Sequence, residues 1–117
     1  MSMRVVALTV FGAALSCRAF AADDPSFYAV NNSNAAIDML FVEPDDDLCW
    51  CGDHLGNQVL RPGDRVLIRP RISRSGSCNY EVKVVYAGGR TQMWRHVDLC
   101  KVTHFIFTGD GRGGPRG

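Results

Sequence analysis

Hydrophobic and polar residues alternate most regularly between Cys78 and Cys100, and we interpret this stretch as a β-hairpin. In its first half every second residue is apolar or aromatic, which is the period of a strand with one buried face. These residues are Tyr80, Val82, Val84 and Tyr86. Gly88-Gly89 follows, and two consecutive glycines supply the positive φ angles that a two-residue hairpin turn requires. The pattern therefore predicts two antiparallel strands joined at these glycines.

The register of this hairpin suggests a disulfide at its open end. With a two-residue turn, Val84 lies opposite Met93, and Cys78 lies opposite Leu99, one position short of Cys100. A β-bulge near the end of the second strand would correct this offset, because a bulge sets two residues of one strand against one residue of the other. We therefore expect Cys78 and Cys100 to be disulfide-bonded.

Further segments show strand patterns, and turn residues separate them. The run from Asn31 to Asn34 ends the first segment, and a Pro62-Gly63 turn precedes the third. The second has apolar residues on both faces, as expected of a central strand that is covered on both sides. With the hairpin, these segments make about six short strands and no convincing helix, so the sequence predicts an all-β fold, a small antiparallel β-sandwich stapled by disulfides. The segments are residues 27–30, 36–42, 65–69 and 102–107.

Residues 1–21 have the three parts of a cleaved secretory signal peptide. A positive start at residues 1–4 precedes an apolar run at residues 5–15, and Ala19-Phe20-Ala21 forms a small-x-small cleavage site. The apolar run is shorter than the roughly 20 residues that span a bilayer. We expect cleavage after this site and a periplasmic or secreted product. The alternative is a lipoprotein with its lipid on Cys17, because Ala14-Leu15-Ser16-Cys17 resembles a lipidation site.

Removal of the signal peptide changes the charge and the cysteine count. Without Arg4 and Arg18, 11 basic residues remain against 12 acidic ones, so no excess of positive charge attracts nucleic acid or anionic lipid. Without Cys17, 4 cysteines remain, an even number that favours disulfides in a small exported chain. We expect one domain at residues 22–108, a monomer without stable membrane insertion. The Gly- and Arg-rich tail at residues 109–117 has too few apolar residues to order itself, so we expect it to be disordered.

A succession of short motifs runs through nearly the whole mature chain. The motifs are Phe27…Val30-Asn31-Asn32-Ser33, Ile37-x-x-Leu40-Phe41-Val42-x-Pro44, Trp50…Leu55-Gly56…Leu60-x-Pro62-Gly63, Cys78-x-Tyr80-Glu81-Val82-Lys83-Val84-Val85-Tyr86, Arg90 and Val97-Asp98-Leu99-Cys100. Together they resemble a family of small exported bacterial proteins with no established activity. The resemblance implies export and the β-sandwich, and it supplies no catalytic residues. Cys49 and Cys51 are not part of the family pattern.

Cys49-Trp50-Cys51 is the most pointed candidate for chemistry. A redox site needs a reactive thiolate beside a resolving thiol. Catalytic cysteines are usually separated by two residues at the start of a helix, whereas here one residue separates them, no helix follows, and the acidic run at residues 45–47 disfavours a thiolate. We favour a structural disulfide, either local or exchanged with the Cys78 and Cys100 pair. A periplasmic thiol-disulfide oxidoreductase is the alternative.

The long connection at residues 43–56 also suggests two kinds of metal site. One set offers sulfur, oxygen and nitrogen ligands suited to zinc or copper(I), although oxidation would consume its thiols. Its members are Cys49, Cys51, Asp53 and His54. The other set offers carboxylates for calcium, at no recognised calcium-loop spacing. Its members are Glu43, Asp45, Asp46, Asp47 and Asp53. A solvated acidic loop without a metal is the alternative to both.

Charged residues elsewhere predict surface roles. One group of arginines is typical of a charged edge strand that discourages aggregation, and it has the charge to lie against the acidic loop. These are Arg61, Arg65, Arg69, Arg71 and Arg74. His96 is expected opposite Glu81 as a cross-strand pair. The histidines are scattered and no serine has the sequence context of a nucleophile, so no catalytic triad is predicted.

These observations predict an exported, non-enzymatic binding or envelope-associated module. Its partner would be an unknown protein or a small ligand, and no cofactor is expected other than a metal ion at one of the sites above. Long loops in small domains often carry function, and an aromatic ring beside carboxylates suits a cationic partner. The candidate binding residues are therefore Trp50, Asp45, Asp47 and Asp53.

Overall fold

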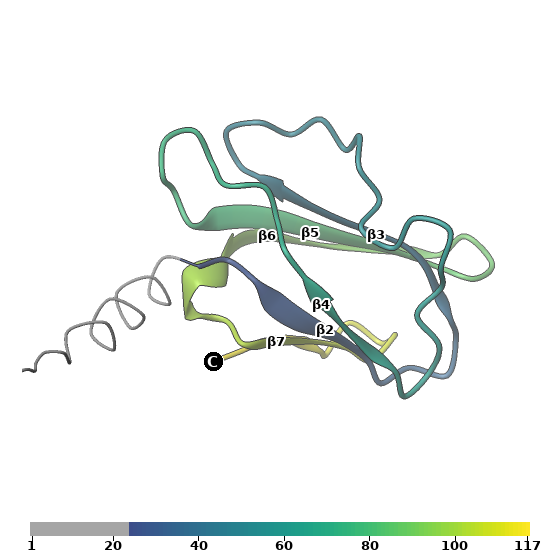
Figure 1. The fold of residues 1–117 in the computed structure, drawn as a ribbon. Helices are drawn as coiled ribbons and strands as arrows, with labels where there is room; N and C mark the ends of the chain where they lie inside the picture. The colour runs from purple at the N-terminus through teal and green to yellow at the C-terminus, as the bar shows by residue number, and fades with distance from the viewer. Residues whose placement is uncertain (1–23) are drawn as a thin grey trace, which may run out of the picture.

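The computed structural model describes residues 24–117, so the predicted signal peptide and the lipidation alternative at Cys17 lie outside the described residues. Two sheets face each other in Figure 1, in the strand orders β4-β2-β7-β8 and β3-β5-β6. The elements are β2 (Phe27–Asn31), β3 (Ile37–Pro44), β4 (Arg65–Ile68), β5 (Asn79–Tyr86), β6 (Thr91–Asp98), η1 (Leu99–Lys101), β7 (His104–Phe107) and β8 (Gly114–Arg116). The predicted disulfide-stapled β-sandwich is confirmed.

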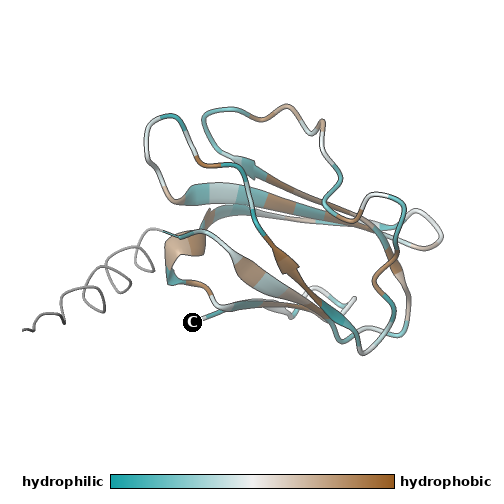
Figure 2. Ribbon diagram, in the orientation of Figure 1, coloured by the Kyte–Doolittle hydropathy of each residue, from teal (hydrophilic) through white to brown (hydrophobic). Residues whose placement is uncertain are grey.

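The core lies between the inner faces of the two sheets, where Figure 2 shows apolar residues at intervals along the strands. Alternation places Phe27 and Ala29 of β2 inward and leaves Tyr28 on the outer face. Trp94 of β6 joins the sheets, because its ring meets Phe105 and Phe107 of β7 edge-on, at centroid distances of 5.1 and 5.4 Å. Such aromatic contacts add about 0.5–1.5 kcal/mol each to the burial of the rings.

Two features of the sheets differ from the sequence prediction. β2 and β7 pair in parallel, so the sandwich is not wholly antiparallel. β3 is an edge strand of its sheet and not a central strand, and it continues through Glu43 and Pro44. The apolar residues on its outer side are covered in part by the loop that follows it, because Phe41 contacts Trp50 of that loop.

The β5–β6 hairpin forms where the alternation predicts it, with a turn one residue longer. Gly88 and Gly89 have φ angles of 95° and 93°, and Ala87 joins them in the loop that is closed by the hydrogen bond from Tyr86 N to Arg90 O, 2.8 Å. The extra residue moves the register by one, so Val84 lies opposite Gln92 instead of Met93.

A bulge later in β6 restores the predicted register at the open end. The pairing shifts between Tyr80 and Val82, and His96 adopts a left-handed φ of 55° there. Tyr80 consequently lies opposite Val97. The predicted pair between His96 and Glu81 is wrong, because the His96 Nδ1 atom lies 3.5 Å from an Asp45 carboxylate oxygen.

Cys78 and Cys100 are disulfide-bonded, as predicted, with their Cα atoms 5.6 Å apart. A turn brings the two cysteines together where a strand bulge was expected. Leu99 N donates to Cys78 O at 3.0 Å, so Leu99 lies opposite Cys78. The η1 turn then brings Cys100 back toward Cys78. Asp98 caps this turn by accepting a hydrogen bond from Cys100 N at 3.2 Å.

The prediction of a disordered tail is corrected by the structure. β8 pairs antiparallel with β7, and Thr103 N donates to Arg116 O at 2.9 Å. Arg90 also donates to Gly109 O at 2.6 Å. Composition led to the wrong prediction because the tail makes these contacts with its own main-chain groups and needs no apolar side chains.

No helix within residues 24–117 is long and apolar enough to cross a membrane.

The first testable prediction concerns the Cys78–Cys100 disulfide. Replacement of both cysteines by serine should lower the free energy of unfolding by about 2–4 kcal/mol, because the bond closes a long loop in the unfolded chain. Urea unfolding at neutral pH measures this difference. A loss below about 0.5 kcal/mol would show that the hairpin end is held by packing alone.

The second concerns the approach of β8 to β7. A Cβ atom on Gly113 would overlap the carbonyl oxygen of Ile106. Gly113→Ala should therefore displace β8 and increase hydrogen exchange at Thr103 N by roughly tenfold or more. Gly52→Ala is the control, because a Cβ at Gly52 meets nothing within 4 Å. Unchanged protection at Thr103 in Gly113→Ala would contradict the described pairing.

Candidate functional site

The loop at residues 45–56 folds over the outer face of the β3-β5-β6 sheet (Figure 1). Trp50 meets Phe41 of β3 edge-on, with ring centroids 6.4 Å apart. The Lys83 ammonium of β5 lies 5.3 Å from the Phe41 ring centre and 5.2 Å from that of Trp50. The Trp50 ring thus already has a cation from within the chain beside it.

Strand register assembles an apolar surface around Lys83. Met39 lies opposite Val85, and Lys83 lies between Phe41 on one side and Met93 on the other. Met39 and Met93 are 44% and 41% exposed. We call this surface the outer apolar face. Its members are Met39, Phe41, Lys83, Val85 and Met93.

The outer apolar face ends at a pair of buried carboxylates. Glu43 and Glu81 lie directly opposite each other on β3 and β5 and are 4% and 7% exposed. Glu43 accepts a hydrogen bond from Arg71 at 2.7 Å. Within residues 24–117, the Glu81 side chain has no ion pair or hydrogen bond. Asp45 lies beyond them, and its Oδ1 atom is buried without a partner among the described residues. Negative charge is therefore concentrated at this end of the face.

Arg71 joins the loop to the β3 strand. Its guanidinium binds Glu43 and Asp47, at 2.7 Å each. Hydrogen bonds to Asp47 and Glu43 raise the pKa of Arg71 above its usual value. Of the arginines predicted to lie against the acidic loop, Arg71 makes this contact.

The other acidic residues of the loop also serve the fold. Asp46 accepts hydrogen bonds from the Ser73 and Ser75 hydroxyls, at 2.8 Å each, and these bonds lower the pKa of Asp46. Asp53 Oδ1 accepts from Leu40 N at 2.9 Å and caps the turn that follows. The structure therefore does not bring the candidate carboxylates Asp45, Asp47 and Asp53 together as one ligand set.

Cys49 and Cys51 form a disulfide with each other, which is the local pairing of the two that the sequence left open. Neither of them is bonded to Cys78 or Cys100. Their oxidised sulfurs are not thiolate ligands, which removes the basis of the zinc or copper set in this state. His54, the remaining nitrogen ligand of that set, donates its backbone N–H to Leu40 O at 2.8 Å, and its ring is half-buried.

Another metal-ligating group brings Cys78, Cys100 and Asp98 together within residues 24–117. Both of its cysteines belong to the second disulfide, so Asp98 alone retains a ligand of the usual kind.

The Cys49–Cys51 bond contributes little to stability. The loop-closure relation gives about 1.5 kcal/mol for so short a ring, against about 3 kcal/mol for the loop that Cys78–Cys100 closes. Trp50, between the two cysteines, has a left-handed φ of 54°. That conformation costs a residue with a side chain roughly 1–2 kcal/mol. The two terms nearly cancel, so stability does not account for this bond.

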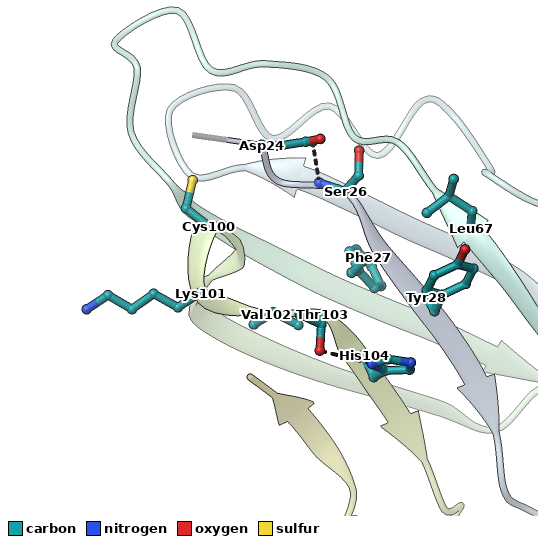
Figure 3. Close-up of a pocket in the computed structure, with 10 residues that line it drawn as sticks. All are labelled: Asp24, Ser26, Phe27, Tyr28, Leu67, Cys100, Lys101, Val102, Thr103 and His104. Carbon is teal, nitrogen blue, oxygen red and sulfur yellow. Dashed lines mark hydrogen bonds between the residues drawn. The ribbon is translucent and has the colours of Figure 1, made fainter. Parts of the chain in front are cut away.

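A separate pocket of about 400 Å³ lies where the start of the described chain meets η1 and β7, as Figure 3 shows. No sequence pattern indicated this pocket. Tyr28 stacks on His104 with ring centroids 5.6 Å apart, and Thr103 shares a hydrogen bond with His104 Nδ1 at 2.9 Å. Lys101 extends away from the other lining side chains in Figure 3. The polar groups here contact one another, so the pocket offers no converging set for a ligand.

Comparison with protein-family models, with curated proteins and with solved structures gave no match. The sequence predictions missed Lys83 and the Glu43–Glu81 pair, and they did not single out Arg71 among the arginines expected against the acidic loop. Each of these residues acquires its role from a residue distant in sequence. A correct alignment of the β3 and β5 strands was the sequence signal that could have placed Glu43 opposite Glu81.

The third prediction follows from the paired carboxylates. Glu81→Gln should raise the free energy of unfolding at pH 7 by about 0.5–1 kcal/mol, because it removes a like charge opposite Glu43. Urea unfolding at pH 7 measures the change. Glu43→Gln is the matched control, with the opposite expected sign because it removes a partner of Arg71. Destabilisation by Glu81→Gln at pH 7 would mean that Glu81 has a favourable partner.

Proposed function

We propose that this chain is an exported, non-enzymatic binding module that recognises a partner protein on the outer apolar face. The observation that carries the proposal is the position of Met39 and Met93, two large apolar side chains that remain exposed on one sheet surface around Lys83. Flexible methionines suit surfaces that adapt to a partner. Contiguous exposed apolar patches are typical of interaction sites.

The negative charge at the end of the outer apolar face favours a partner that carries positive charge. Glu43, Glu81 and Asp45 place negative charge beside the apolar residues, and Arg71 offsets only part of it. A protein segment with apolar residues followed by lysine or arginine complements this order. Nucleic acid does not, because its phosphates would be repelled by the carboxylates.

An extracytoplasmic location is consistent with this role. The two disulfides indicate an oxidising environment outside the cytoplasm. Location in the periplasm or secretion is proposed from the signal-peptide pattern of residues 1–21, together with the resemblance to small exported bacterial proteins. The proposed form in solution is a monomer.

The fourth prediction tests the face with a peptide library displayed on phage. Selection on the oxidised protein should enrich peptides that combine apolar residues with lysine or arginine. The double variant Met39→Asp/Met93→Asp should bind them at least roughly tenfold more weakly, because it adds charge to the desolvated centre of the contact. Calorimetric titration with synthetic versions of the enriched peptides measures the difference.

The matched control is Leu67→Asp, on the outer face of the other sheet. Leu67 is 38% exposed, close to the two methionines, so the control adds a similar charge at a similar exposure. Its peptide affinity should equal that of the wild type. Equal binding by the double variant, or an equal loss in Leu67→Asp, would overturn the proposed face. Dimerisation in sedimentation experiments, abolished by the double variant, would identify a second copy as the occupant instead.

A further inference from the structure

We propose that Cys49–Cys51 is a thiol-disulfide exchange site that oxidises a small or peptide dithiol, with Cys51 as the sulfur attacked and Cys49 as the sulfur released. The exchange is stoichiometric, one dithiol for each bond, so it goes beyond the non-enzymatic binding role without contradicting it, and it does not depend on the outer apolar face. It starts from accessibility, because Cys49 and Cys51 are both exposed while Cys78 and Cys100 are half-buried. Attack on a disulfide requires a path to one sulfur, and exposed bonds are the labile ones.

The environment of Cys49 disfavours attack at its own sulfur and stabilises the thiol that remains after reduction. Its Sγ atom lies 3.6 Å from a carboxylate oxygen of Glu43, which is 4% exposed. In the oxidised state this sulfur has no proton to donate, so the contact is not a hydrogen bond. After reduction the Cys49 thiol can donate to that carboxylate, which favours the protonated form. The same negative charge repels a thiolate that approaches Cys49.

The environment of Cys51 suits an incoming thiolate. Cys51 lines a pocket of about 370 Å³, whereas Cys49 does not. The charged residues of the lining are Arg69, Arg71, Glu43 and Asp53, and Arg71 is paired with Glu43. Arg69 is exposed at this pocket, and its guanidinium attracts anions. Gly52 carries no side chain that would obstruct the approach. Access through this pocket, with the exposed guanidinium of Arg69 in its lining, therefore favours attack at Cys51.

The electrons and protons of the exchange are all accounted for when the dithiol is the only reductant. One thiolate of the dithiol attacks Cys51 Sγ, a mixed disulfide forms, and the Cys49–Cys51 bond breaks with its electron pair on Cys49, which takes a proton from water. The second thiol of the dithiol loses its proton and attacks its partner sulfur in the mixed disulfide, so that Cys51 leaves and is protonated. The dithiol loses two electrons and becomes a disulfide, and the protein gains two thiols.

Reduction should also change the position of Trp50. The bond holds Trp50 in its left-handed conformation against Phe41 and beside Lys83. Once the ring of the disulfide opens, the backbone of Trp50 is free to leave this conformation. Fluorescence of Trp50 in a Trp94→Phe background therefore reports the reaction, because the chain has 2 tryptophans.

The fifth prediction tests exchange on the full oxidised chain with dithiothreitol as the dithiol probe. Samples are alkylated over time and mapped by mass spectrometry. Cys49 and Cys51 should become alkylated at least roughly tenfold faster than Cys78 and Cys100, with a parallel change in Trp50 fluorescence. Equal rates, or earlier reduction of Cys78–Cys100, would overturn the proposal. Peptide binding to the outer apolar face is measured separately on the oxidised protein, so failure of either proposal is distinguishable from failure of the other.

The assignment of the two sulfurs is tested with single free thiols. In Cys49→Ser, Cys51 should react with an aromatic disulfide reagent roughly tenfold faster at pH 7 than Cys49 does in Cys51→Ser. Adding Glu43→Gln to Cys51→Ser should remove most of that difference. Adding Glu81→Gln instead is the control, because Glu81 is a neighbouring carboxylate without a contact to either sulfur in the described structure. Equal reactivity of the two thiols, with Cys78–Cys100 intact in both variants, would refute the assignment.

Discussion

Burial of the inner side of β5 is the constraint on which the rest of the structure depends. β5 is the middle strand of its sheet, and Tyr80, Val82, Val84 and Tyr86 are each at most 1% exposed. Burial of a large apolar side chain contributes about 1.5–3 kcal/mol, so a shift of β5 by one residue would lose several such terms at once. With the inner face determined, Glu81, Lys83 and Val85 necessarily point outward.

The core is connected to the candidate site through a short series of polar contacts. The buried Tyr80 ring donates its hydroxyl to Arg71 O at 2.7 Å, and burial raises the pKa of that hydroxyl. The guanidinium of Arg71 in turn holds Glu43 and Asp47. Glu43 then lies beside Cys49. The buried Tyr80 side chain is thereby connected, through Arg71 and Glu43, to Cys49.

The two disulfides differ in what they do for the molecule. Cys78–Cys100 joins the open end of the hairpin and closes a loop with a sequence separation of 22. Cys49–Cys51 has a sequence separation of 2, joins no separate elements, and constrains only Trp50. The first bond is accounted for by stability, whereas the second is better accounted for by chemistry at an exposed loop.

The sequence by itself determined the β-sandwich class, most strand positions and the Cys78–Cys100 bond, because alternation of apolar residues and glycine φ angles are local properties. The sequence did not determine the length of the hairpin turn, because Ala87-Gly88-Gly89 can form a two-residue or a three-residue loop. Packing between the strands selects the three-residue loop. Only the tertiary structure decided that β2 pairs in parallel with β7, that the tail completes a sheet edge, and that Arg71 and Lys83 enter the site. These outcomes depend on contacts between residues far apart in the chain, whose energies are absent from any local pattern.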